Sequence, residues 1–97
     1  MNLPELESSE TKWWESAEGH RFALEVLQLR ARRDILKFIG NGLRSAKEIA
    51  KEFGLKENQV TFHLAMLEKA LVVEPAGDCY RSTPTGILYL ENVESRS

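Results

Sequence analysis

The segment SAKEIAKEFGLKENQVTFHLAMLEKALVV, residues 45–73, constrains the fold of this chain more than any other part of it. It begins with the capping-box pattern S-x-x-E, in which Ser45 accepts from the backbone N–H of Glu48 and the glutamate carboxylate reaches back. Gly54 suits the left-handed position just past a helix end. We therefore predict a short helix up to this glycine. Its inward stripe would consist of Ala46, Ile49, Ala50 and Phe53.

A second helix is expected over residues 57–70, because Val60, Leu64 and Leu67 recur at helical spacing. Two helices joined by three or four residues that include a glycine are the signature of a helix-turn-helix. The side of the second helix that points away from the core is rich in amide and hydroxyl groups. It would present Asn58, Gln59, Thr61, Phe62 and Ala65.

Two further helices are predicted before this motif. The first runs from Arg21, with Phe22, Val26 and Leu29 at positions i, i+4 and i+7 and with alanine and leucine widening the stripe. The second covers ARRDILKFI, and the following GNG ends it. Its inward residues would be Ile35, Leu36, Phe38 and Ile39.

A hairpin and a last helix are predicted after the motif. LVVE and CYRS are short and β-prone, with PAGD between them, so residues 71–82 read as a hairpin. Thr83 is a natural N-cap and Pro84 a natural first residue for a final helix. The predicted fold is mainly α with a small β-hairpin: a winged helix-turn-helix with an extra N-terminal helix.

The charge of the chain is unevenly distributed. Residues 1–18 hold five acids and one base, a balance of −4, whereas the whole chain carries −2, so the other 79 residues carry +2. Local field governs binding to a polyanion more than total charge does. We predict an acidic arm over residues 1–18, partly helical around Trp13 and Trp14, and a winged helix-turn-helix domain over 19–97. The weakly basic charge of this domain permits DNA binding without demanding it.

Several classes of function find no support in the sequence. No apolar run reaches the length of a membrane span and no secretory signal is present, so a cytoplasmic protein without a membrane partner is expected. Cys79 is the single cysteine, and no closely spaced Cys/His cluster exists, so no metal site within one chain is expected. Cys79 is interpreted as a residue that fills a strand, with a redox role as the alternative. Phosphate loops and nucleophile elbows are absent, so we predict no enzyme and no cofactor.

From about Phe22 to Leu90 the chain resembles the arsenical-resistance repressor (ArsR) family of prokaryotic winged-helix transcription factors. The resemblance rests on RARRDILKFIGNG, on SAKEIAKEFGLKENQVTFHLAMLEKALVVE and on YRSTPTG, in this order. It implies a dimeric DNA-binding regulator whose second motif helix enters the major groove. Metal-sensing members carry paired cysteines in the helix that corresponds to AKEIAKEF, and this chain has none there. The arsenic or zinc response is therefore not expected.

The expected DNA contacts are of two kinds. Asparagine and glutamine amides pair with adenine, and threonine or phenylalanine can meet the thymine methyl group. The candidates for base contact are Asn58, Gln59, Thr61 and Phe62. Basic side chains around the motif hold phosphates without reading sequence. The candidates for phosphate contact are Arg44, Lys47, Lys51, Lys56 and Arg81.

Three residue types leave alternatives open. Phe62 contacts thymine or folds against the neighbouring helix. His63 is interpreted as a hydrogen-bonded structural residue rather than a pH sensor. The basic run RARR is interpreted as a solvated helix face, with Arg30 and Arg33 on one side, although it could flank DNA.

A homodimer is expected, because C2 pairing presents two reading helices to a pseudo-palindrome. Exposing both tryptophans would be costly, so residues of about 9–20 are predicted to form a helix against the last helix or a symmetry mate. The expected interface residues are Trp13, Trp14, Phe22 and Leu88. An aromatic ligand or partner site at the tryptophans is the competing idea. The alternative prediction for the whole chain is a winged-helix protein–protein interaction module with little or no DNA binding. The weakly charged wing and the acidic arm favour this alternative.

Overall fold

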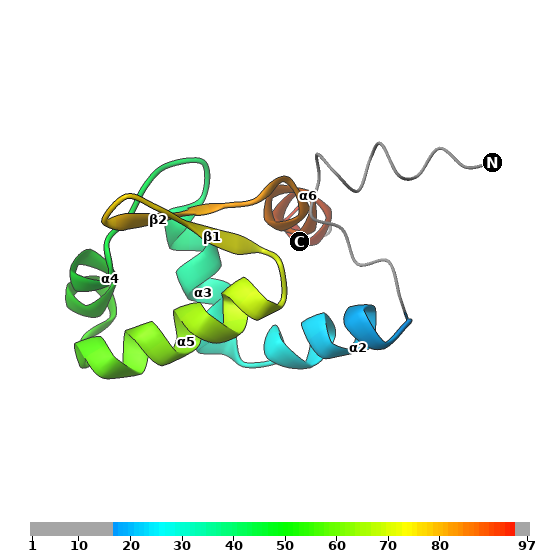
Figure 1. The fold of residues 1–97 in the computed structure, drawn as a ribbon, viewed down its shortest axis with the longest axis horizontal. Coiled ribbons are helices and arrows are strands. Elements are labelled where there is room, and N and C mark those ends of the chain that lie inside the picture. The colour runs from blue at the N-terminus through cyan, green and yellow to red at the C-terminus, as the bar shows by residue number, and fades with distance from the viewer. Residues whose placement is uncertain (1–16, 95–97) are drawn as a thin grey trace.

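The computed structural model describes residues 17–94, which contain five helices and one two-stranded antiparallel hairpin (Figure 1). In chain order they are α2 (Ala17–Val26), α3 (Arg30–Ile39), α4 (Ala46–Phe53), α5 (Glu57–Lys69), β1 (Val73–Ala76), β2 (Cys79–Ser82) and α6 (Pro84–Glu94). The predicted class, mainly α with a small β-hairpin in a winged helix-turn-helix arrangement, is confirmed. The acidic arm up to residue 16, with Trp13 and Trp14, lies outside the described residues.

The helix-turn-helix pair α4–α5 has the predicted local signals. Ser45 Oγ accepts from the backbone N–H of Glu48 at 3.1 Å, and Glu48 Oε1 accepts from the N–H of Ser45 at 2.8 Å. Gly54 ends α4 with φ +65°, a left-handed conformation that costs glycine little. Three residues, 54–56, separate the two helices, as in a helix-turn-helix.

One core supports this pair. In Figure 1, α3 lies between α5 along the lower edge and the hairpin along the top, and α4 packs at the left. Ile49, Val60 and Leu64 are fully buried at the centre of the helix-turn-helix, so the orientation of α5 is fixed by close packing behind it. The other fully buried large apolar side chains of the described residues are Ile35, Leu36, Ile39, Leu67, Val26, Val72 and Val73.

The hairpin is a wing with a two-residue turn. The register pairs Ala76 with Cys79, so β1 extends through Pro75 and Ala76, further than the sequence suggested. Gly77 has φ +66°, which suits the first turn position of a type II′ hairpin. Arg44, just before α4, forms a bridge with Tyr80 through N–H to O bonds of 3.1 and 2.8 Å. The wing is therefore tied to the chain segment that leads into the helix-turn-helix.

Thr83 caps α6 as predicted. Its Oγ1 accepts from the backbone N–H of Gly86 at 3.0 Å and donates to the carbonyl oxygen of Leu71 at 2.6 Å. Gly86 allows the first turn of α6 to lie directly against the backbone of Val72, because a β-carbon there would overlap the Val72 carbonyl. The wing and the last helix are thus held together at close range.

The first described helix differs from the prediction. It starts at Ala17 rather than Arg21 and ends at Val26, and Leu29 is 48% exposed instead of lying on the buried stripe. The physical reason is that Leu29 occupies the N-cap position of α3, where its carbonyl accepts from the N–H groups of Arg32 and Arg33. The chain turns there, so Leu29 does not continue the apolar face of α2.

The interpretation of RARR as a solvated face is wrong for two of its arginines. Arg32 is only 7% exposed and lies inside the contact between α2, α3 and α5. Arg33 Nη1 donates to the carbonyl oxygens of Leu27 and Gln28 at 2.8 Å each, so it binds the free carbonyls that follow α2. Arg30 is solvated, with Nε 3.7 Å from Asp34 Oδ2.

Candidate nucleic-acid interface

One side of α5 is polar and open to solvent over its first two turns. Asn58, Gln59, Thr61 and Phe62 are all exposed, and we call these four residues the reading face. Val60 lies between them in sequence and is fully buried, which fixes the direction in which the others point. The structure therefore brings together all four residues that the sequence proposed for base contact.

Two of the polar side chains on the reading face also bond to the backbone of the helix. Gln59 Oε1 accepts from the backbone N–H of Lys56 at 3.0 Å and so satisfies a donor at the N-terminus of α5. Thr61 Oγ1 donates to the carbonyl oxygen of Asn58 at 3.1 Å. The Gln59 NH₂ group is not used in this bond and remains on the solvent side. The cap thus favours one orientation of the amide.

Phe62 is 57% exposed and also contacts α3. The Arg32 guanidinium carbon lies 5.7 Å from the centre of its ring, within cation–π range. The His63 ring is 6.1 Å away and tilted by 56°. Phe62 thus contacts α3 through Arg32 and remains more than half exposed, and its contact with thymine stays a prediction.

His63 is hydrogen-bonded, in agreement with its structural interpretation. Its Nδ1 accepts from Arg32 Nε at 3.1 Å. Burial lowers the pKa of His63 below its ordinary value of 6.5, and the positive charge of Arg32 lowers this pKa further. Burial also lowers the pKa of Arg32, but a guanidinium remains charged at neutral pH. The pair is therefore a cation bound to a neutral imidazole.

The five candidates for phosphate contact separate into two groups. Lys47 and Lys51 are exposed on α4, and Lys56 is exposed in the turn that leads into α5. Arg44 stacks on Phe38, with its guanidinium carbon 4.2 Å from the ring centre, and its Nη1 is 3.9 Å from Glu48 Oε2.

Arg81 on the wing forms a closer ion pair, with Nε 2.9 Å from Glu74 Oε2 on the facing strand. Two of the five cations thus have partners within the chain, and the other three are exposed lysines.

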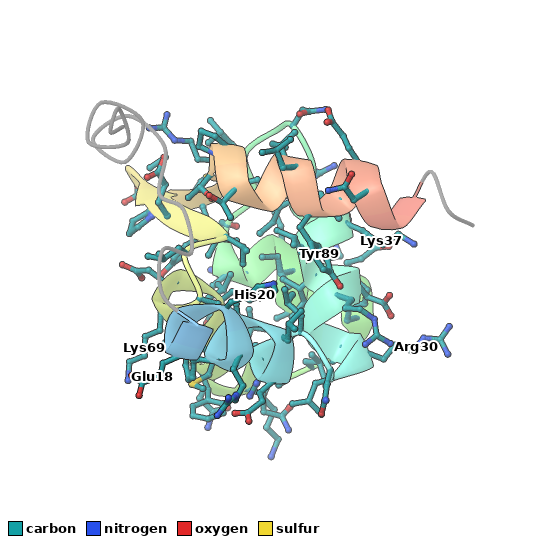
Figure 2. All side chains as sticks on the ribbon, turned by 90° about the vertical axis from the view of Figure 1, so that its right-hand side faces the viewer. Glu18, His20, Arg30, Lys37, Lys69 and Tyr89 are labelled. Atoms are coloured by element: carbon teal, nitrogen blue, oxygen red, sulfur yellow. The ribbon has the colours of Figure 1, made fainter. Side chains whose placement is uncertain are left out.

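The described dimer candidates lie on helices at the same end of the molecule. Phe22 is half-buried on α2 and Leu88 is 40% exposed on α6. Figure 2, which views this end, shows α6 lying above α2, with Tyr89 pointing from α6 toward α3. Burial raises the pKa of Tyr89, and the charge of Arg33 on α3 opposes this. Tyr89 thus lies on the side of α6 that packs against the core, whereas Leu88 is exposed to solvent.

Other kinds of site have little support within residues 17–94. This part of the chain contains no group of three or more histidine, cysteine, aspartate or glutamate residues placed to hold a metal ion. Cys79 is half-buried on β2. No helix among these residues is long and apolar enough to cross a membrane.

Comparison with known families decides what this motif is. A family model described as a helix-turn-helix domain matches residues 27–76, which are 50 of the 97 residues. The chain belongs to this helix-turn-helix family. The matched range contains α3, α4, α5 and β1, and therefore the whole reading face. Helix-turn-helix domains are typically non-enzymatic and bind double-stranded DNA. No curated protein and no solved structure matches the chain.

Proposed function

We propose that this chain is a sequence-specific double-stranded DNA-binding transcriptional regulator of the ArsR-like winged-helix type, with α5 in the major groove and the hairpin as its wing. The observation that carries the proposal is the reading face. A helix packed as the second member of a helix-turn-helix presents two amides, a hydroxyl and an aromatic ring to solvent from its N-terminal half. Recognition helices contact base edges with their N-terminal residues.

The chemistry of the reading face suits A·T base pairs. An asparagine or glutamine amide accepts from adenine N6 and donates to adenine N7, and apolar groups meet the thymine methyl group. Asn58 and Gln59 supply the amides, and Phe62 supplies exposed apolar surface. Lys47 and Lys51 on α4 are exposed and supply the sequence-independent attraction to phosphates.

The regulator acts as a cytoplasmic homodimer in this proposal and needs no cofactor or metal. Two copies related by C2 symmetry would present two α5 helices to half-sites about one helical turn apart. Trp13, Trp14, Phe22 and Leu88 are proposed as interface residues. Support comes from the position of α2 and α6 at one end of the molecule, away from α4 and from the start of α5 (Figure 1).

A salt titration of duplex binding with matched variants tests the function. For the unmodified chain, the logarithm of the binding constant should fall linearly with the logarithm of salt concentration. Lys51→Ala should reduce the slope by about 0.9 and leave sequence preference unchanged, because it removes one phosphate contact. Asn58→Ala should relax the preference with little effect on the slope. Gln28→Ala removes an exposed amide between α2 and α3, outside α4, α5 and the hairpin; it is the matched control and should change neither.

A second function, a protein-interaction module, is favoured by one specific observation. Arg81 Nε is paired with Glu74 on the wing, and the Arg44 guanidinium lies over Phe38, so both arginines already have partners within the chain. Absence of duplex binding even at low salt would refute the DNA proposal and favour this alternative.

A further inference from the structure

Arg32 connects three helices from a buried position. It is 7% exposed on α3; its Nε donates to His63 Nδ1 on α5 at 3.1 Å, and its Nη1 donates to the carbonyl oxygen of Val26, the last residue of α2, at 3.4 Å. Its guanidinium carbon is 5.7 Å from the ring centre of Phe62. One cation thus contacts two consecutive side chains of α5, one of which belongs to the reading face.

The two α5 partners of Arg32 have different exposures. His63 is half-buried, whereas Phe62 is 57% exposed. Because Arg32 Nε carries a hydrogen, His63 Nδ1 must be the unprotonated nitrogen of a neutral ring. The imidazole therefore holds the Arg32 guanidinium at a place that is 5.7 Å from the centre of the Phe62 ring.

We propose that Arg32 is a positioning residue for DNA reading: it holds the ring of Phe62 and the imidazole of His63 in place from behind α5 without touching DNA itself. The reading part of this inference rests on the function proposed above. Arg32 is too buried to meet a phosphate, so its effect must pass through its two neighbours on α5.

The other two arginines of α3 have different contacts. Arg33 binds the carbonyl oxygens of Leu27 and Gln28 beyond the end of α2, and the Arg30 side chain is 85% exposed beside Asp34. Within residues 17–94, the side chains of Arg30 and Arg33 bond to other parts of the chain and not to α5. Arginine suits position 32 because its planar fork donates from Nε and Nη1 in fixed directions while its face approaches an aromatic ring. A lysine keeps the charge but cannot reproduce these three contacts together.

The first test uses the free protein and needs no DNA. Arg32→Met removes the charge and the donors, Arg32→Lys keeps the charge, and Arg30→Met removes a charge from the same helix as a matched control. The chain has two histidines, so NMR titration of their rings can follow His63. Arg32→Met should raise the His63 pKa and shift the Phe62 ring resonances, and Arg30→Met should change neither.

Arg32→Lys should shift the Phe62 resonances with a smaller change in the His63 pKa, and it provides the measurement if Arg32→Met does not fold. Unchanged His63 and Phe62 signals in a folded Arg32 variant would overturn the proposal.

The second test compares binding to the duplex selected by the unmodified chain from a random pool with binding to a scrambled duplex. Loss of one well-placed base contact corresponds to about tenfold or more in affinity. The Arg32 variant should therefore bind the selected duplex about tenfold more weakly and the scrambled duplex within about twofold, with an unchanged salt slope. Arg30→Met should keep the ratio between the two duplexes.

The remaining outcomes separate the two proposals. Equal losses on both duplexes would show a merely structural role, and a slope reduced by about 0.9 would show a phosphate contact. Either result would overturn the reading role of Arg32. If the unmodified chain has no sequence preference, the proposed function fails and the reading role fails with it. The free-protein titration then still decides whether Arg32 positions Phe62 and His63.

Discussion

Gln59 has two roles in this account, and two substitutions separate them. Its Oε1 accepts from the backbone N–H of Lys56 at 3.0 Å, and its NH₂ group is available for adenine. Gln59→Glu keeps an acceptor oxygen at the same place and adds negative charge in the first turn of α5. Gln59→Ala keeps neither the acceptor nor the amide.

The expected stabilities follow from these contacts. Gln59→Ala loses one hydrogen bond at an exposed helix end, which should cost about 0.5–1 kcal/mol of unfolding free energy. Gln59→Glu retains the bond and gains about 0.3–1 kcal/mol from the helix dipole. The nearby Glu57 reduces this gain by repulsion. The glutamate variant should therefore be more stable than the alanine variant by about 1 kcal/mol.

The expected DNA affinities run in the other direction. Both variants lose the NH₂ donor to adenine N7, which should cost about 1–3 kcal/mol on the preferred duplex. The glutamate variant also brings a carboxylate toward the phosphates and should bind more weakly than the alanine variant. Urea denaturation and fluorescence anisotropy on the same preparations measure both orders. If Gln59→Glu retains the sequence preference, Gln59 does not contact bases. If the glutamate variant is no more stable than the alanine variant, the bond from the Lys56 N–H to Gln59 does not stabilise α5 as expected.

Two further predictions concern packing and pH. Gly86→Ala should lower the unfolding free energy by about 1–2 kcal/mol, because the new β-carbon would overlap the Val72 carbonyl. This loss should outweigh the better helix propensity of alanine. Urea denaturation measures the change, and Gly42→Ala is the control, because its β-carbon would meet only the Ile39 carbonyl oxygen at 3.7 Å. Burial and the charge of Arg32 lower the His63 pKa in the folded state, so folding favours the neutral ring. This stabilisation of the folded state is fully present above the ordinary pKa of 6.5, and it is lost as the pH falls through the lowered pKa of the folded state. The urea midpoint should fall between pH 7 and pH 5, and less so in His63→Gln; an equal fall in that variant would contradict this reasoning.

The helix-turn-helix could be predicted because its signals are local. Ser45 and Glu48 satisfy each other within one turn, and Gly54 takes a positive φ that other residues avoid. The period of Val60 and Leu64 then fixes which side of α5 is exposed. None of these inferences depends on where distant parts of the chain lie.

The boundary between α2 and α3 was mispredicted because it depends on how two helices meet. Leu29 fits the apolar period of a longer helix, and only the start of α3 at Arg30 shows that its side chain points outward. Arg32 was missed for a different reason: the run RARR looks like solvated charge. A usable signal was present, since Arg32 lies three, four and seven residues before Ile35, Leu36 and Ile39 and so shares their buried side.

The candidate site was predictable as a surface but not in its pairings. The Gly77–Asp78 turn places Glu74 opposite Arg81, so their ion pair could have been derived from the hairpin register. The stacking of Arg44 on Phe38 could not, because it depends on how the loop between α3 and α4 brings Arg44 back beside Phe38. Lys56 has no side-chain acceptor, so the sequence lacked the usual capping signal for α5 and the cap from Gln59 went unnoticed.

Atom-by-atom alteration of the selected duplex tests most directly whether α5 reads bases in the major groove. Replacing adenine with 7-deazaadenine removes the major-groove N7 acceptor, replacing thymine with uracil removes the methyl group, and 3-deazaadenine alters only the minor groove. Our account predicts weaker binding for the first two changes at the contacted positions and little effect of the third. Full affinity for the 7-deazaadenine and uracil duplexes, or a loss confined to 3-deazaadenine, would contradict it.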